Sequence, residues 1–282
     1  MLPLPWRDQA AVWLAPSQVG LALRRRGWRT QAAQHRDATL EGGASAPAAA
    51  LQALAALAAQ ATADGQATRA HTRIVLSNRF VPSALMPGAT ALRGAAERQL
   101  AAREVLRATH GDGVDNWALA LDTRGGANPL AAGLEANWLA TLRTTAQQAG
   151  LQAVSIRPLL AVAAAQAWPH IEGRSVWLLV TEADGAVLAR IDTRGTWQSL
   201  RSLVLGTPTD ADALSASIAV WLARCCLLDG LEPADLPLVY APWQWASKDA
   251  GQSQADFAAT VTNAGWQLQT VALSPDALWT SP

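Results

Sequence analysis

Alternating apolar and polar positions in the first half of the chain predict three short strands in succession, then a helix and a fourth strand. Leucines at a spacing of three residues give the predicted helix one apolar face, and Asp64 and Gly65 end it. We expect strands over residues 11–15, 19–24, 28–35 and 72–76, and a helix over residues 46–63.

The second half of the chain repeats the same order of elements. Gly185 accepts the positive φ of a two-residue hairpin turn after the first strand of this half, and Asp210 or Asp212 is placed to cap the helix. A further helix and strand follow at the end. The expected strands cover residues 175–182, 186–192, 196–205, 236–240 and 267–273, and the helices end near residues 228 and 264.

The repeated order predicts an α/β fold with two mixed sheets, each flanked by helices. Between the repeats we expect helices over residues 92–109 and 134–149, strands over 117–122 and 151–156, and a connecting helix over 158–167. The sequence therefore predicts two similar domains, at residues 1–157 and 158–282. The first carries an inserted subdomain at about residues 78–122.

Composition narrows the class of protein. Half of the 282 residues are hydrophobic, and 22 basic side chains balance 22 acidic ones, which excludes a disordered chain and a globally basic nucleic-acid-binding protein. Cys225 and Cys226 are the only cysteines and lie in a predicted helix, so we expect them to be buried. The start of the sequence lacks the pattern of a signal peptide, and no long strongly apolar run occurs. We expect a cytoplasmic protein without a membrane span.

The duplicated unit resembles the actin-like, Hsp70-like and sugar-kinase-like ATPase superfamily, whose domains are RNase H-like. Within it, the chain is most similar to the actin-like protein of type IV pilus assembly and to the cytoplasmic domain of the type II secretion L protein. The resemblance implies duplicated domains with five-stranded mixed sheets. The stretches that carry it are residues 73–87 (RIVLSNRFVPSALMP), 96–105 (AERQLAAREV), 138–158 (WLATLRTTAQQAGLQAVSIRP) and 177–206.

The chain departs from this family at its three nucleotide-contacting elements. Where the family has an acidic residue and glycine in its first phosphate loop, this sequence has Trp13 and Pro16. The second loop would need Asp-x-Gly, but residues 180–182 are Val-Thr-Glu. The adenosine-binding Gly-Gly pair is replaced by residues 241–243, Ala-Pro-Trp. We therefore expect no enzyme activity, no nucleotide-binding or catalytic residues and no cofactor.

The resemblance implies a non-catalytic scaffold or adaptor in a type IV pilus or type II secretion-like inner-membrane assembly. Such a protein docks the short cytoplasmic tail of a single-span membrane partner in a groove of its first domain, and that partner recruits it to the inner membrane. Residues 77–87 and the following helix would lie near this groove, which makes Asn78, Arg79 and Phe80 the candidate partner-binding residues. Whether the protein forms a homodimer is left open.

Two other functions stay open at this point. An active ATPase or nucleotide switch would need acidic residues that position a metal ion, and Glu182, Asp184 and Asp192 are the nearest candidates. A carbohydrate- or peptide-binding module would use exposed tryptophans, with Trp243 and Trp245 on one face of an extended segment.

Other chemistry has little support in the sequence. The four histidines lack metal-ligand spacing, and the acidic residues after His110 lack the spacing of a calcium loop. No nucleophile elbow or glycine-rich phosphate loop occurs. The run from Arg24 to Arg26 is typical of a solvated turn. We expect no metal site and no nucleic-acid partner.

Overall fold

The computed structural model describes residues 8–25, 32–41, 46–65, 69–122, 128–183, 185–205, 211–243 and 250–279. Its first sheet has the order β3-β2-β1-β4-β8. The first three strands along the chain pair antiparallel, whereas β4 and β8 run parallel to β1. The strands are β1 (Gln9–Leu14), β2 (Gln18–Arg24), β3 (Gln34–Thr39), β4 (Ala70–Leu76) and β8 (Leu151–Pro158).

The second sheet repeats this arrangement. Its order is β11-β10-β9-β12-β13: β9, β10 and β11 pair antiparallel with one another, and β12 and β13 run parallel to β9. The predicted α/β fold class, with duplicated five-stranded mixed sheets flanked by helices, is confirmed. The strands are β9 (Val176–Glu182), β10 (Gly185–Ile191), β11 (Trp197–Val204), β12 (Leu238–Pro242) and β13 (Leu268–Thr270).

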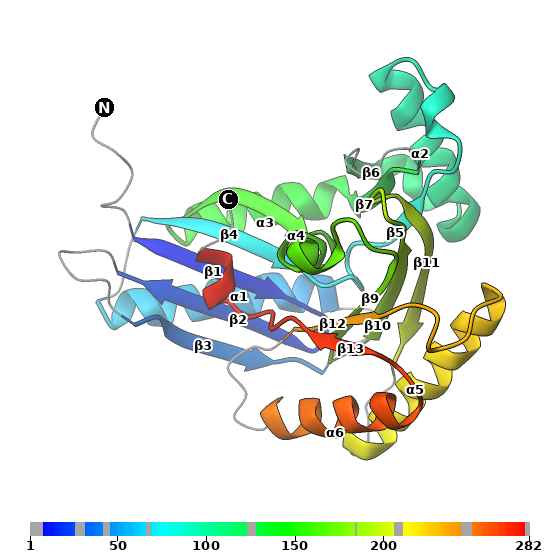
Figure 1. The fold of residues 1–282 in the computed structure, drawn as a ribbon. Coiled ribbons are helices and arrows are strands. Elements are labelled where there is room, and N and C mark those ends of the chain that lie inside the picture. Colours follow the sequence, from blue (N-terminus) through cyan, green and yellow to red (C-terminus); the bar gives the residue numbers. More distant parts are fainter. Residues whose placement is uncertain are drawn as a thin grey trace.

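Helices separate and cover the two sheets (Figure 1). α1 (Ala46–Ala63) and α3 (Ala136–Gln148) pack on one face of the first sheet, and α5 (Ala211–Leu228) and α6 (Ala250–Asn263) on one face of the second. α4 (Leu159–Ile171) lies between the sheets, where its apolar residues join side chains of both in one core. The two halves therefore share a core as well as a chain connection.

The length and composition of α1 would allow it to cross a membrane, and among the described helices it is alone in this. Its leucines Leu51, Leu54 and Leu57 are nevertheless buried against the first sheet. Their burial is what a core helix requires, as the spacing of three residues predicts.

A third, smaller sheet leaves the first half after β4. It has the order β5-β7-β6 and is covered by α2 (Ala95–His110). Gly133 of β7 leaves room for the Trp117 ring, because a Cβ atom there would lie 2.4 Å from that ring. The strands are β5 (Ser83–Leu85), β6 (Trp117–Asp122) and β7 (Leu130–Glu135), and the short helices η2 (Ala89–Ala91) and η3 (Asp112–Asn116) flank α2. The domain boundary at residue 157 stays a prediction.

The structure differs from the sequence prediction most clearly around β3, β5 and β7. The third strand was expected over residues 28–35, but β3 runs over Gln34–Thr39, and residues 28–31 lie outside the described part. β3 is an edge strand whose side chains are mostly exposed, so it carries no apolar alternation. The expected helix over 134–149 begins only at Ala136 because Leu134 and Glu135 belong to β7. The short strand β5 was not predicted.

The end of the described chain returns to the first sheet. Residues of η5 (Asp276–Trp279) enter the core between the sheets, and Leu278 and Trp279 are buried there. Arg73 of β4 donates a hydrogen bond to the Leu278 carbonyl, and the Arg24 guanidinium lies 4.9 Å from the centre of the Trp279 ring. Arg24 therefore belongs to this contact rather than to a solvated turn, while Arg26 lies outside the described residues.

Candidate functional site

The three elements expected to have lost nucleotide chemistry lie close together. Trp13 of β1 is 1% exposed, and its ring centre lies 4.8 Å from that of Trp243, which follows β12. The Trp243 amide donates to the Thr181 carbonyl, and the Thr181 hydroxyl contacts the Tyr240 hydroxyl at 3.3 Å. Side chains from both sheets therefore fill the space where these strands end.

These residues do not fit a phosphate cradle, which needs a concave backbone rich in N–H donors. Pro16 lacks an N–H, and the Ala15 amide donates to Gln18 within the turn. The Trp13 and Trp243 rings contact each other here, where such a cradle would need open backbone. Among the described residues, no group of three or more His, Cys, Asp or Glu side chains is placed to hold a metal ion.

The candidate metal-positioning acids have different surroundings. Glu182 is 6% exposed, and its Oε1 accepts a hydrogen bond from the Asn78 amide at 3.1 Å. Asp192 accepts hydrogen bonds from the Arg194 and Thr196 amides, which makes it a turn residue. Asp184 lies outside the described residues, as does Trp245 of the candidate sugar platform.

Asn78 joins three elements at the junction of the two halves. It follows β4, its amide binds Glu182 at the end of β9, and its side-chain Oδ1 accepts a hydrogen bond from the Leu160 amide at 3.0 Å. Leu160 is in the first turn of α4, whose amides have no partner within the helix. Asn78 therefore ties the start of the inter-sheet helix to both sheets.

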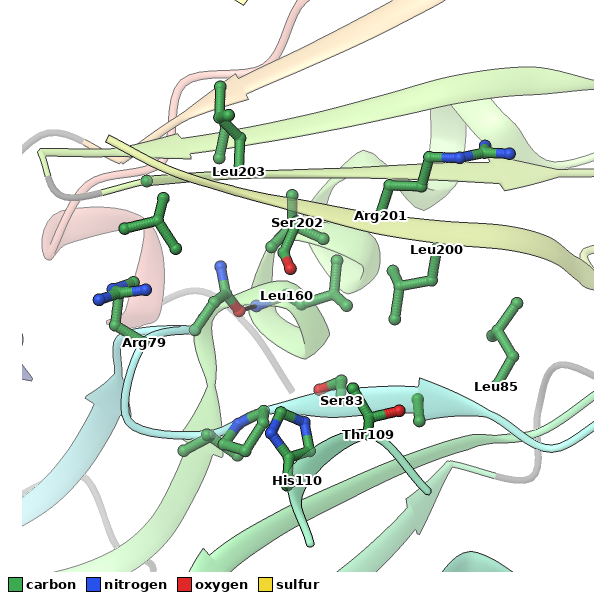
Figure 2. A pocket seen from close by; sticks show the side chains of 18 of the residues that line it. Arg79, Ser83, Leu85, Thr109, His110, Leu160, Leu200, Arg201, Ser202 and Leu203 are labelled. Atoms are coloured by element: carbon green, nitrogen blue, oxygen red, sulfur yellow. Dashed lines mark hydrogen bonds between the residues drawn. The ribbon is translucent and has the colours of Figure 1, made fainter. Parts of the chain in front are cut away.

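A cavity of about 660 Å³ opens beside this junction. We call it the β5–β11 groove, because β5 and the end of α2 form one side and β11 forms the other (Figure 2). Residues of β10 and Leu160 also line it. In Figure 2, Leu200 and Ser202 of β11 point toward Leu85, Ser83, Thr109 and His110 across the groove.

The candidate partner-binding residues separate in the structure. Asn78 and Arg79 both line the β5–β11 groove, and the Arg79 side chain is exposed. Within the described residues, no carboxylate pairs with the Arg79 guanidinium. Phe80 points elsewhere and packs on Trp138 of α3, with ring centres 5.4 Å apart. The structure therefore brings Asn78 and Arg79 together and leaves Phe80 in the core under α1 and α3.

The groove also holds residues that the sequence did not single out. Ser83 Oγ and Asn78 Nδ2 are buried atoms of the lining, and within the described part of the chain neither has a hydrogen-bond partner. Ser202 comes from β11, far along the chain. No local motif marks Ser83 or Ser202, since only the packing of the two halves places them together.

Strand β11, one side of the groove, is held in place by an ion-pair cluster around Asp229. Arg201 of β11 and Arg190 of β10 both pair with Asp229, which follows α5 and has a 6% exposed side chain. Ser199 donates a further hydrogen bond to Asp229 at 2.9 Å. Burial by itself raises the pKa of the Asp229 carboxyl, but the hydrogen bonds and charges of its partners outweigh burial and hold that pKa below its usual value.

Comparison with solved structures gives the fold a family context. A Bacteroides thetaiotaomicron protein with an actin-like ATPase fold and unknown function is 6% identical, covers 95% of this chain and 91% of its own, and has a TM-score of 0.58. A chain of the PilM–PilN type IV pilus biogenesis complex is 16% identical, with coverages of 99% and 93% and a TM-score of 0.61. The cytoplasmic domain of EpsL, an inner-membrane component of the Vibrio cholerae type II secretion system, is 13% identical, with coverages of 90% and 95% and a TM-score of 0.48.

The chain has the actin-like ATPase fold, and the predicted resemblance is confirmed at that level. No protein-family model matches the sequence, and no curated protein matches it.

Proposed function

We propose that this protein is a non-catalytic actin-like scaffold in a type IV pilus or type II secretion-like inner-membrane assembly. It binds the cytoplasmic tail of a single-span membrane partner and is held at the inner membrane by that partner. The fold shared with a chain of the PilM–PilN complex supports the assembly role. The observation that carries the proposal is the β5–β11 groove, a cavity of about 660 Å³ that β5 and the end of α2 line on one side and β10 and β11 on the other.

Edge strands suit this function for a physical reason. Within the described sheets, β5 pairs only with β7 and β11 only with β10, so the outer edge of each strand has backbone groups available. An extended peptide that adds to such an edge gains main-chain hydrogen bonds, while pockets along the edge select its side chains.

The absence of catalysis in the proposal rests on the aromatic contact between the sheets. Trp13 and Trp243 contact each other at positions where the resemblance implies nucleotide-contacting residues. Glu182, which accepts a hydrogen bond from the Asn78 amide, lies at a third such position. The protein would keep the two-sheet architecture as a rigid frame and use the groove for binding.

The test is a calorimetric titration of the purified protein with synthetic cytoplasmic tails of the single-span membrane proteins encoded beside its gene. We expect one tail to bind, and the Ser202→Trp variant, which fills the groove, to lose that binding. The Arg143→Ala variant changes an exposed residue of α3 and serves as the control. Binding that Ser202→Trp leaves intact would move the tail to another surface, and no binding by any tail would remove the proposal.

A further inference from the structure

Helix α5 is apolar on its outer face as well as on its inner face. The inner face packs against the second sheet through four buried residues, Ile218, Leu222, Cys225 and Cys226. On the outer face, Val220 is 72% exposed and Leu227 is 71% exposed. Arg224 is the only charged residue from Ser215 to Leu228. A helix that is apolar all round is covered on all sides in most proteins, so this outer face is suited to a partner.

The exposed apolar residues of α5 form a regular line along the helix. Four exposed residues, which we call the α5 seam, recur at spacings of four, three and four residues. At about 100° per residue, they lie within about 60° of the helix circumference. This is the spacing with which one helix packs along another. The α5 seam consists of Ala216, Val220, Ala223 and Leu227.

Small and large side chains alternate along the α5 seam, and this order fits a second copy of the same chain. In an antiparallel pair, a two-fold axis through the middle of the seam places Val220 opposite Ala223 of the second copy. The same axis places Leu227 opposite Ala216 of the second copy. Every large side chain therefore faces a small one in all four layers, which allows the helices to approach closely. A parallel pair would instead place alanine on alanine and leucine on leucine.

The charges around the α5 seam also favour a second copy over a lipid surface. Arg224 lies beside the seam, and the turn after α5 carries the exposed Glu232 and Asp235. Anionic lipid headgroups select an excess of lysine and arginine around an apolar helix face, and this surface lacks that excess. In the antiparallel pair, Arg224 of each copy lies nearest Ser217 of the other, so no like charges oppose each other.

The α5 seam and the β5–β11 groove lie on opposite faces of the second sheet. α5 packs on the face that carries Leu179 and Leu188, whereas α4 and the groove residue Val187 lie on the other face (Figure 1). A second copy at α5 therefore leaves the groove open. A single helix pair buries less than the ~1,200 Å² typical of stable complexes, so the association is weak and depends on concentration.

We propose that two copies of this protein associate through their α5 seams as an antiparallel, two-fold pair. Each copy buries Val220 and Leu227 against the alanines of the other. The dimer goes beyond the proposed tail binding and does not rest on it, and each copy in the dimer keeps its own groove.

The test is sedimentation velocity of the purified protein from about 1 to about 200 µM. We expect the wild type to shift from monomer to dimer across this range. Ala216→Glu and Leu227→Arg each place a charge against an apolar side chain of the second copy, so each should raise the dimer Kd by about tenfold or more.

The double variant with both changes tests the orientation of the pair. It places glutamate opposite arginine of the second copy, so it should dimerise about tenfold more tightly than either single variant. The two positions are about 16 Å apart along one helix, which means that the ion pair forms only between copies. A parallel pair would place like charges together and would gain nothing.

Leu100→Arg is the matched control, because Leu100 of α2 is 62% exposed and lies outside the seam. It should leave the dimer Kd unchanged. Thermal unfolding at the lowest concentration, where the chains are single, should be alike for all variants, since an exposed side chain adds little to the stability of one chain.

Four results would overturn the proposal. A wild type that stays monomeric throughout would exclude the dimer, and single variants that dimerise like the wild type would move it to another surface. A double variant as weak as the single ones would exclude the antiparallel register. A monomeric wild type that floats with phosphatidylglycerol vesicles, and loses this as Ala216→Glu, would assign the face to the membrane. In each case the titration with encoded tails still decides the proposed function.

Discussion

The indole rings of Trp13 and Trp243 belong to different halves of the molecule, yet their centres lie 4.8 Å apart at a tilt of 39°. Trp13 faces the core that α4 shares with both sheets, and Trp243 packs against the same core. This aromatic pair therefore helps to hold the two halves together and fills part of the space between them.

Replacing Trp13 with alanine should destabilise the protein strongly. The residue is 1% exposed, and truncating such a buried side chain costs about 3–5 kcal/mol. Urea unfolding should show a much lower midpoint for Trp13→Ala. Leu227→Ala on α5, where the leucine is 71% exposed, should change the stability by less than about 0.5 kcal/mol. Equal midpoints for the two variants would contradict this account of the core.

Mg-ATP and Mg-ADP should leave the thermal unfolding of the wild-type protein unchanged. A ligand that binds only the folded state stabilises it by about 2.7 kcal/mol at one hundred times its Kd, which a thermal-shift measurement detects easily. Calorimetric titration provides the second readout. Micromolar binding in either experiment would mean that the chain holds phosphates despite Trp13 and Pro16, and the nucleotide-switch alternative would replace the scaffold.

Asp229→Asn should weaken the protein at neutral pH but not in acid. The pKa of this carboxyl is held below its ordinary value of 3.8, so its stabilising contribution is fully present above pH 4 and is lost as the pH falls through the folded-state pKa. We expect a loss of about 1–3 kcal/mol at pH 7, since both arginine partners are partly exposed.

The measurement for Asp229 is urea unfolding at several pH values. The difference between the wild type and Asp229→Asn should shrink steadily below pH 4. Asp112→Asn is the matched control, because that side chain is 99% exposed and only 3.9 Å from Arg107 at its nearest approach. A difference that stays constant down to pH 2 would show that the carboxylate charge at Asp229 is not what stabilises the fold.

The two cysteines should react slowly with Ellman's reagent while the protein is folded. Both are at most 1% exposed, and burial raises the pKa of the Cys226 thiol from 9.0 to about 12. At pH 8 that shift leaves roughly a thousandfold less thiolate than in an unfolded chain. The raised pKa also means that the stability contributed by the neutral thiol is present below pH 9 and is lost as the pH rises toward 12.

In urea, both cysteines should be labelled completely in a reaction time that leaves the native protein unmodified. A Cys225→Ala, Cys226→Ala double variant gives the background. Rapid labelling of the folded wild type would show that α5 opens far more readily than its packing against the second sheet indicates.

Much of the fold could be predicted because its apolar pattern is local. α1 and β6 begin and end at the expected residues, since leucines on one helix face and alternating residues in a strand are both visible in the sequence. β7 has the sequence LAAGLE, in which alanine and glycine hide the strand, and Gly133 is explained only by the Trp117 ring that packs on it. β3 lies further along the chain than expected because the side chains of an exposed edge strand need not alternate between apolar and polar.

The candidate site could be predicted only in part. Residues 77–87 were expected near a tail-binding groove of the first domain, and Asn78 and Arg79 line a cavity between the two halves. Their role in partner binding stays a prediction. Phe80 is the next residue, but its side chain points away from the groove and packs on Trp138 of α3. The opposite wall comes from β11, and no spacing in the sequence reveals that Ser202 lies across the groove from Ser83, because that arrangement depends on how the two halves pack on α4.

The return of Leu278 and Trp279 to the first sheet sets a condition on folding during synthesis. β1 and its neighbours leave the ribosome before the other described elements, but these two residues, which complete the cover on that face, emerge only after almost all of the remaining described chain. Until then, the apolar side of the nascent first sheet around Trp13 has no finished partner surface. Chaperones bind such exposed apolar surfaces. The amount of folded protein in a cell should therefore depend on chaperones more strongly than the stability of the finished fold would indicate.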